Sequence, residues 1–197
     1  MLEEIKFEKI LKIIDLRKAN IIGIAGIVPI FMLFFLPYYL IWKDKHTLSY
    51  IKQTLNKTDL IDNSLLLSLI SILVMTIGII LHELIHGLTW SIFAKNGFKS
   101  IKFGILLKML TPYCHCKEPL KVKHYILGGI MPGIVLGIIP AIYSIFIGNI
   151  FLLIFGSFFT LAAMGDFMII NLIRKENKDS FVQDHPTEAG CYVYRKK

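Results

Sequence analysis

The chain has 197 residues, of which 55% are hydrophobic and only 18% are charged, and its mean hydropathy is +0.63. This composition excludes an ordinary soluble domain, because such a domain carries more polar and charged residues. The net charge of +8 does not indicate a nucleic-acid partner, since the basic residues lie between long apolar runs, as in the cytoplasmic loops of membrane proteins.

Four apolar segments are each long enough to span a bilayer as a helix, which requires about 20 mostly apolar residues. They cover residues 20–42, 64–94, 125–147 and 150–173. Only Gly148 and Asn149 join the last two segments, which predicts a tight helical hairpin. We therefore expect an all-α membrane protein, a single multi-pass domain over residues 1–197 with the lipid bilayer as its surroundings.

The basic residues predict the orientation of these helices. With both termini in the cytoplasm, 18 of the 22 Lys and Arg residues face the cytoplasm and 4 face the other side. The positive-inside rule favours that arrangement, which also places the 95–124 connection in the cytoplasm. We expect the protein in the cell membrane, and its three cysteines, all in cytoplasmic segments, as free thiols.

The second apolar segment contains the H-E-x-x-H pattern Leu81-His82-Glu83-Leu84-Ile85-His86. At 3.6 residues per turn, the two histidines lie on one helix face and can bind one zinc ion, with Glu83 beside them as a general base. Residues 64–81 contain no charged residue, so an ionisable cluster at this depth is costly unless it has a function. The alternative is a structural hydrogen-bonded cluster at the membrane interface.

The connection between the second and third helices alternates short apolar runs with lysines. Residues 100–107 and 109–116 predict a small cytoplasmic β-hairpin, whose exposed edge can hold a peptide in extended form. Cys114, His115, Cys116, Glu118 and His124 are metal-binding residue types, but their spacing differs from that of a closed structural zinc site. Surface or packing roles are favoured. Contact of His115 or His124 with a substrate or an oxyanion remains the alternative.

The third and fourth helices carry two further features. Residues 128–133, Gly-Gly-Ile-Met-Pro-Gly, interrupt the third helix, either to line a cavity or as a simple kink with close packing. Asp166 is the only acidic residue of the fourth helix, at a depth similar to that of His86, and is the best candidate for a third zinc ligand. A structural hydrogen bond is the alternative for Asp166. Gly165 is expected to permit close approach of a neighbouring helix.

The C-terminal tail, residues 183–192, is polar and too short for a domain. We expect it to pack as a cytoplasmic cap on the site. Asp184 and His185 are interpreted as capping residues at the start of a helix and not as a second ligand pair.

The order of an H-E-x-x-H helix, a Pro-Gly helix and an intramembrane Asp resembles the site-2 proteases, a class of intramembrane zinc proteases. More closely, the chain resembles a bacterial family described as putative zincin peptidases, DUF3267, over most of residues 65–194. The resemblance is carried by residues 82–87, 112–120, 131–133, 165–166 and 182–186. It implies that His82, His86 and Asp166 are zinc ligands and that Glu83 is the catalytic residue.

The sequence thus predicts a membrane-embedded zinc metalloprotease that hydrolyses peptide bonds in membrane or juxtamembrane substrates. Zinc polarises a water molecule and the scissile carbonyl, and Glu83 transfers the proton to the leaving amine. The alternative is a proteolytically inactive membrane scaffold or a metal-binding component of a transporter. A transporter is disfavoured because we find neither an internal repeat nor paired broken helices.

Overall fold

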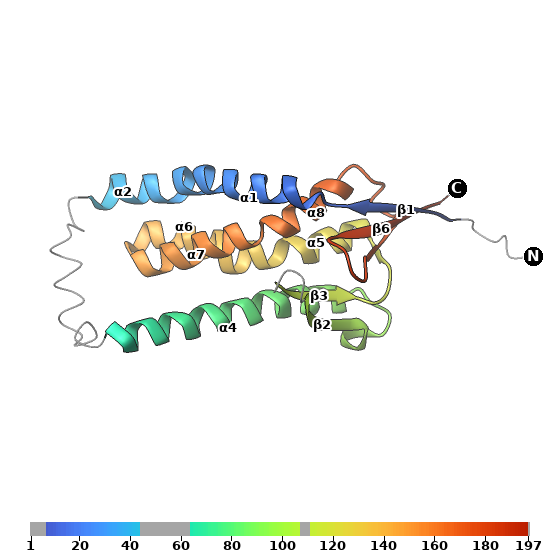
Figure 1. Cartoon of the computed structure of the whole chain (residues 1–197), viewed down its shortest axis with the longest axis horizontal. Coiled ribbons are helices and arrows are strands. Elements are labelled where there is room, and N and C mark those ends of the chain that lie inside the picture. Colours follow the sequence, from blue (N-terminus) through green and yellow to red (C-terminus); the bar gives the residue numbers. More distant parts are fainter. Residues whose placement is uncertain (1–6, 44–63, 107–110, 197) are drawn as a thin grey trace, which may run out of the picture.

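The computed structural model describes residues 7–43, 64–106 and 111–196. Helices run along its long axis, and strands gather at one end (Figure 1). The helical segments are α1 (Leu16–Ile30), the π-helical turn η1 (Phe31–Phe35), α2 (Leu36–Trp42), α4 (Ser64–Ser91), the 3₁₀ turn η2 (Gly97–Ser100), α5 (Val122–Pro132), the π-helical turn η3 (Gly133–Ile138), α6 (Ile139–Ile147), α7 (Ile150–Ala162) and α8 (Met164–Ile173). The strands are β1 (Phe7–Ile13), β2 (Ile101–Leu106), β3 (Thr111–Cys116), β4 (Leu120–Lys121), β5 (Phe181–Asp184) and β6 (Gly190–Lys196).

Joined end to end, the long helical segments form four spans that are long and apolar enough to cross a membrane. Their bounds are Arg17–Trp42, Leu65–Ser91, Val122–Ile147 and Ile150–Ile173. The prediction of four helices of this length is therefore confirmed, with ends that differ by a few residues. The first begins earlier than predicted because the Asp15 side chain accepts hydrogen bonds from the backbone N–H groups of Arg17 and Lys18 and so caps α1.

Two π-helical turns widen the first and third spans. Each directly precedes a helix whose second residue is proline, Pro37 in α2 and Pro140 in α6. Proline has no N–H to bond to the preceding turn, and a π-helical turn there accommodates the missing hydrogen bond. The predicted interruption at residues 128–133 thus corresponds to the junction of α5 and η3, a continuous but irregular helix.

The turn between α6 and α7 has the predicted tight form. Gly148 adopts the left-handed conformation, with φ of 71°, that ends α6, and the Asn149 side chain accepts a hydrogen bond from the N–H of Leu152 to begin α7. The Tyr38 hydroxyl and the Trp42 indole donate to main-chain carbonyls at the end of α6 and in this turn. The first span is thereby attached to the helical hairpin of α6 and α7, at the end of the molecule opposite the strands.

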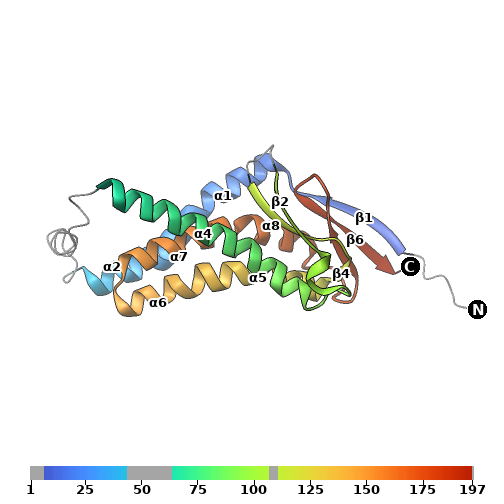
Figure 2. The same ribbon diagram turned by 90° about the horizontal axis from the view of Figure 1, so that it is seen from below.

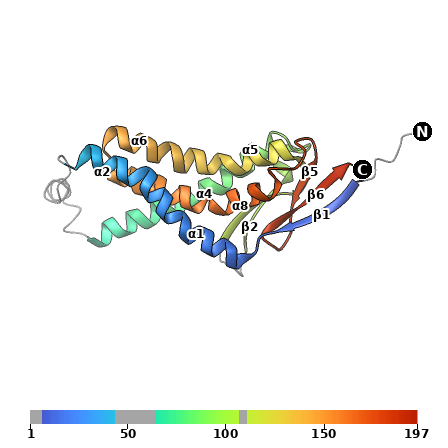
Figure 3. The ribbon, with the colours of Figure 1, turned by 90° about the horizontal axis from the view of Figure 1, so that it is seen from above.

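Strands form two antiparallel sheets, so the predicted all-α fold is wrong at this end of the molecule. The larger sheet has the order β1-β6-β5-β4 and joins the N-terminal segment to the C-terminal tail. Figure 3 shows it beyond the ends of α1 and α8. β2 and β3 form the second sheet, which is the hairpin predicted within residues 100–116. β1 and β6 were not predicted, because these two strands pair with each other although they lie far apart in the sequence.

The tail forms β5 and β6 instead of the start of a helix. Asp184 ends β5, and its carboxylate accepts hydrogen bonds from the Tyr125 hydroxyl and from the N–H of Cys116. His185 Nδ1 accepts from the N–H of Glu188 and so closes the turn before β6. The prediction that Asp184 and His185 cap a helix is therefore wrong, because strand pairing and a buried carboxylate use these residues instead.

Ion pairs attach the terminal strands to the end of α8. Glu176 has a side chain that is only 5% exposed and pairs with Lys12 of β1 at 2.6 Å and with Arg195 of β6 at 2.8 Å. These cations lower the pKa of Glu176 to about 2, chiefly through the hydrogen bond from Arg195. Lys12 also donates to the carbonyl of Leu172 in α8. The sheet is thus held against the helix that carries Asp166.

Both described ends of the chain lie at the same end of the molecule (Figure 1). α1 and α5 begin there, α4 and α8 end there, and the turn between α6 and α7 lies at the opposite end. α4 crosses the other helices at an angle (Figure 2), and its C-terminal part contacts α5 and the β2–β3 hairpin. Any membrane crossed by all four spans therefore has β1, β6 and the hairpin on one side.

We predict that this side is the cytoplasm, because the count along the sequence assigns 18 of the 22 basic residues to the side that holds the chain termini and the 95–124 connection. A reporter fused after Lys197 should give a cytoplasmic signal, and one inserted at Lys52 should give an external signal. Lys52, like most of the connection between the first two spans, lies outside the described residues. The orientation would be refuted if both fusions reported the same side or if the fusion at Lys197 reported the outside.

Candidate metal centre

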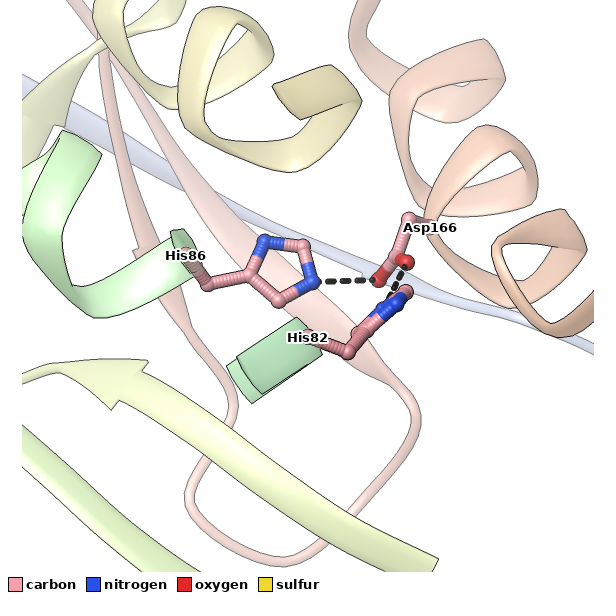
Figure 4. Close-up of side chains that lie close together, drawn as sticks. All are labelled: His82, His86 and Asp166. Carbon is pink, nitrogen blue, oxygen red and sulfur yellow. Dashed lines mark hydrogen bonds and ion pairs between the residues drawn. The ribbon is translucent and has the colours of Figure 1, made fainter. Parts of the chain in front are cut away.

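His82 and His86 lie one helical turn apart on α4 and point toward Asp166 of α8 (Figure 4). Nε2 of His82 is 3.1 Å from one carboxylate oxygen of Asp166, and Nε2 of His86 is 3.4 Å from the other. The side chains of His82 and His86 are 10% and 4% exposed, whereas that of Asp166 is 28% exposed. The two predicted histidines and the predicted carboxylate thus meet in one place, although 84 residues separate His82 from Asp166.

The three side chains have the geometry and the chemistry of a zinc site. Each offers one ligand atom, and these atoms all lie within 4.8 Å of one another. In a tetrahedron with metal–ligand bonds of about 2.0 to 2.1 Å, neighbouring ligand atoms are roughly 3.3 to 3.4 Å apart. The two histidine–carboxylate distances are of this size, although each runs to a different oxygen of Asp166. Two histidines and one carboxylate also form a ligand set of catalytic zinc, which leaves the fourth position for water. The residues therefore fit this metal.

The orientation of His86 is fixed by its surroundings. Nδ1 lies 2.9 Å from the carbonyl oxygen of Gly128 in α5. Because a carbonyl only accepts, Nδ1 carries a proton, so Nε2, which faces Asp166, is the nitrogen that could bind a metal. The ring also stacks on Trp90, with centroids 5.1 Å apart, and the Trp90 indole donates to the carbonyl of Tyr125. α5 thus supports this candidate ligand at two points.

His82 is held differently, by packing. Its ring lies against Phe159 of α7 at a centroid distance of 6.4 Å and edge-on to His86 at 5.0 Å. Phe159 occupies the space that a side chain at Gly78 would need. Among the described residues, buried Nδ1 of His82 has no hydrogen-bond partner. The structure therefore fixes His82 through shape, and its Nε2 is the nitrogen that meets Asp166.

Glu83 is not one of the three converging residues, but it faces the same cavity. This cavity has a volume of about 270 Å³, and its lining includes His82, Glu83, His86 and Asp166. The main chain of β3 interacts with the Glu83 carboxylate at Cys114. A side chain at Gly87 would clash with the hairpin, so this glycine lets β2 and β3 pack closely on α4. Glu83 thus lies beside the candidate metal ligands, where a general base would be needed.

The other candidate metal-binding residues, at positions 114–124, have different surroundings in the structure. His115 of β3 lines the cavity, whereas the His124 ring stacks on Phe93 at 4.0 Å and is not part of the lining. The Glu118 carboxylate accepts hydrogen bonds from Lys95 N–H and the Ser100 hydroxyl and so holds the loop after α4. The three cysteines are free, as predicted, and all three are buried.

The tail packs at the site as expected, since Asp184 and residues 188–190 line the cavity, but it also forms a polar cluster that the sequence interpretation missed. Asp184, which also lines the cavity, accepts from the Tyr125 hydroxyl, and the Tyr125 ring stacks on Trp90 at 5.2 Å. Contacts therefore run from Asp184 through Tyr125 and Trp90 to His86. Burial raises the pKa of Asp184 above its usual range. An aspartate at the end of a short polar strand carries no local signal of burial, so only the fold reveals this cluster.

Gly165 does not have its predicted role. A side chain built at Gly165 would meet nothing within 4 Å, so no helix approaches closely there. Gly165 instead borders the cavity next to Asp166. Close helix contacts occur at other glycines, because a side chain at Gly137 would clash with Thr160 and one at Gly156 would clash with Ala141. The prediction failed because helix spacing cannot be inferred from a single small residue.

Gly128 offers a test of how α5 supports His86. A side chain at Gly128 would clash with the Trp90 indole, which stacks on His86. Gly128→Ala should displace both and weaken zinc binding by about tenfold or more, as with other outer-shell changes. Gly129→Ala is the matched control, because its new methyl group would meet only the flexible end of Ile170. Zinc titration of both purified variants distinguishes them. Equal affinities would show that this contact does not orient His86.

Comparison with known families is consistent with this geometry. Residues 75–181, more than half of the chain, match the model of the family described as "Putative zincin peptidase" (DUF3267). The match includes the H-E-x-x-H stretch, the β2–β3 hairpin and Asp166, and ends just before residues 182–186. Searches of curated proteins and of solved structures find no match. The chain belongs to the DUF3267 family of putative zincin peptidases.

Proposed function

We propose that this protein is a membrane-embedded zinc metalloprotease. The observation that carries the proposal is the convergence of His82, His86 and Asp166, with ligand atoms within 4.8 Å, in spans long and apolar enough to cross a membrane. A carboxylate and two histidines are costly in such helices unless they pair or bind an ion. Membership of a zincin family supports zinc as the ion and peptide hydrolysis as the reaction class.

The residues of the proposed site have different roles in the reaction. His82, His86 and Asp166 hold the zinc, which supplies Lewis-acid polarisation of a water molecule and of the scissile carbonyl. Glu83 accepts the proton of the attacking water and delivers it to the nitrogen of the leaving amine.

His115 is proposed to contact the substrate. Burial lowers the pKa of His115 below its usual value, so its ring is neutral at pH 7 and donates one hydrogen bond. From the cavity wall this donor is available to the oxygen of the carbonyl under attack. His124 is not proposed for this role, because its ring packs against Phe93 and is not part of the cavity lining.

The proposed substrates are peptide segments within the membrane or next to it. The cavity lies between spans and is bordered by β3, which among the described strands pairs only with β2. Along the other edge of β3, the N–H of Cys116 already donates to Asp184 and the main chain at Cys114 interacts with Glu83. An extended peptide that paired with this edge would therefore have to replace these two contacts. A cytoplasmic orientation of this end supports cleavage near the cytoplasmic surface of the cell membrane.

The second candidate function is a membrane scaffold or transporter component that binds metal but does not hydrolyse peptides. The same three ligands would serve it. Glu83 is the residue that separates the two, because a scaffold needs no base beside its metal.

Glu83→Gln should therefore retain zinc and abolish hydrolysis. The amide keeps the size of the side chain but cannot accept the proton of water. Zinc content is measured by atomic emission, and hydrolysis by cleavage of a transmembrane reporter peptide in detergent. The double variant His82→Ala, His86→Ala is the zinc-free control. Wild-type protein that holds zinc but cleaves no presented peptide would favour the scaffold, and loss of zinc in Glu83→Gln would make Glu83 a ligand.

Asp166→Asn should weaken zinc binding by at least about tenfold, because it removes the negative charge while keeping shape and most hydrogen bonds. Asp166→Ala should be at least as damaging. His124→Ala is the matched control, a histidine removed outside the cavity. Zinc titration and a protease-protection assay of membrane insertion check the outcome. Full zinc occupancy and activity in both Asp166 variants would refute its role as a ligand.

A further inference from the structure

A second cavity lies beside the candidate metal centre, between the start of α1 and α8. Its volume is about 410 Å³, and its apolar lining includes Ile22 of α1 and Met164 and Phe167 of α8. A cavity of about 150 Å³ already accommodates a benzene ring, so this one has room for a large apolar side chain. Neither the metal ligands nor Glu83 are part of its lining.

The two cavities are neighbours that share walls. Ile14, Ala19 and Met168 line both of them. Met164, Phe167 and Met168 lie three and four residues apart and so share one face of α8, whereas Asp166 lies on the nearly opposite face, about 150° around the helix. Met168 lines both cavities and so connects the two faces. One helix therefore presents the candidate metal ligand to one cavity and an apolar surface to the other. A side chain at Gly165 would meet no atom within 4 Å, so the metal side of α8 is open.

The chemistry of this second cavity fits a peptide side chain. Most of its lining residues are apolar. The polar ones come from the ends of α1 and α8 nearest the strands and are Asp15, Lys18 and Asn171. Asp15 already caps α1 through its carboxylate, so it is not an unpaired charge in the cavity. An apolar side chain can enter such a space while its main chain stays near polar groups. A lipid is the alternative occupant, because its headgroup could meet the same polar border, and the test below distinguishes the two.

We propose that this cavity is a specificity subsite, which binds a large apolar side chain of a peptide whose backbone passes the metal centre. Methionine at two of its wall positions gives it an adaptable surface that suits aromatic as well as aliphatic side chains. The proposal rests on the proposed peptidase function, since it assigns a substrate class to the same site. It predicts selection for Phe, Leu or Met near the scissile bond.

Ile22 allows the subsite to be filled without touching the metal centre. Its side chain is 46% exposed, so Ile22→Trp should be tolerated, and the larger ring should occupy the cavity. Ile22→Ala enlarges the same space. Ile21→Trp is the matched control, because Ile21 precedes it on the same helix, is 66% exposed and does not line the cavity.

The test measures binding separately from cleavage. Zinc-loaded Glu83→Gln protein in detergent is titrated with fluorescent Ala-based peptides in which a single Phe is moved along the sequence. One Phe position should raise affinity about tenfold over the all-Ala peptide, as expected for filling an apolar pocket. Ile22→Trp should abolish that gain, whereas Ile22→Ala and Ile21→Trp should keep it. Zinc content should be the same in all variants.

Three results would overturn the subsite. The first is the absence of any favoured Phe position, and the second is that Ile22→Trp keeps the gain in affinity that Phe gives. The third is that Ile22→Trp changes the amount of copurified phospholipid without changing the peptide preference, which would make the cavity a lipid site. Failure of the peptidase function has a different signature, since wild-type protein would then leave the favoured peptide uncleaved while Ile22→Trp still abolished the Phe gain.

Discussion

The contact between Asp166 and the two histidines of α4 is the constraint on which the rest of the structure depends. A carboxylate inside an apolar helix is expensive unless an opposite charge or an ion compensates it. That requirement brings α8 toward α4, although 84 residues separate His82 from Asp166. α5 then supports His86 through Gly128, and α7 supports His82 through Phe159. Four helices thus converge on one small polar cluster.

Hydropathy predicted the helices well, because a lipid environment requires apolar runs of a set length and leaves few alternatives. The exact ends of the helices depend on local capping groups such as Asp15 and Gly148, which hydropathy does not detect. The predicted bounds therefore differ from those in the structure by a few residues. The hairpin was also predictable, since its two strands are close in sequence. The β1–β6 pair was not, because neither strand contains information about a partner so far away in the chain.

The residues of the candidate site also differ in whether the sequence alone could identify them. His82, Glu83 and His86 follow from one helical turn, and Asp166 follows from the cost of a lone carboxylate in lipid. Asp184 could not be identified, since its burial depends on the tail folding back against α5 and β3. For Gly165 the sequence suggested close packing and the structure shows open space. Properties of single residues were predictable, whereas the space around them depends on neighbours distant in sequence.

The pairing of β1 with β6 sets an order for folding during synthesis. Among the described elements, β1 leaves the ribosome first and β6 leaves it last. At roughly 5–20 residues per second, β1 waits on the order of ten to forty seconds for its partner. All four spans precede β5 and β6, so His82, His86 and Asp166 are in place before Asp184 and Gly190 close the cavity wall. A chain interrupted before β6 would therefore carry the candidate ligands in an unfinished pocket, and the enclosed site forms only after that strand has been made.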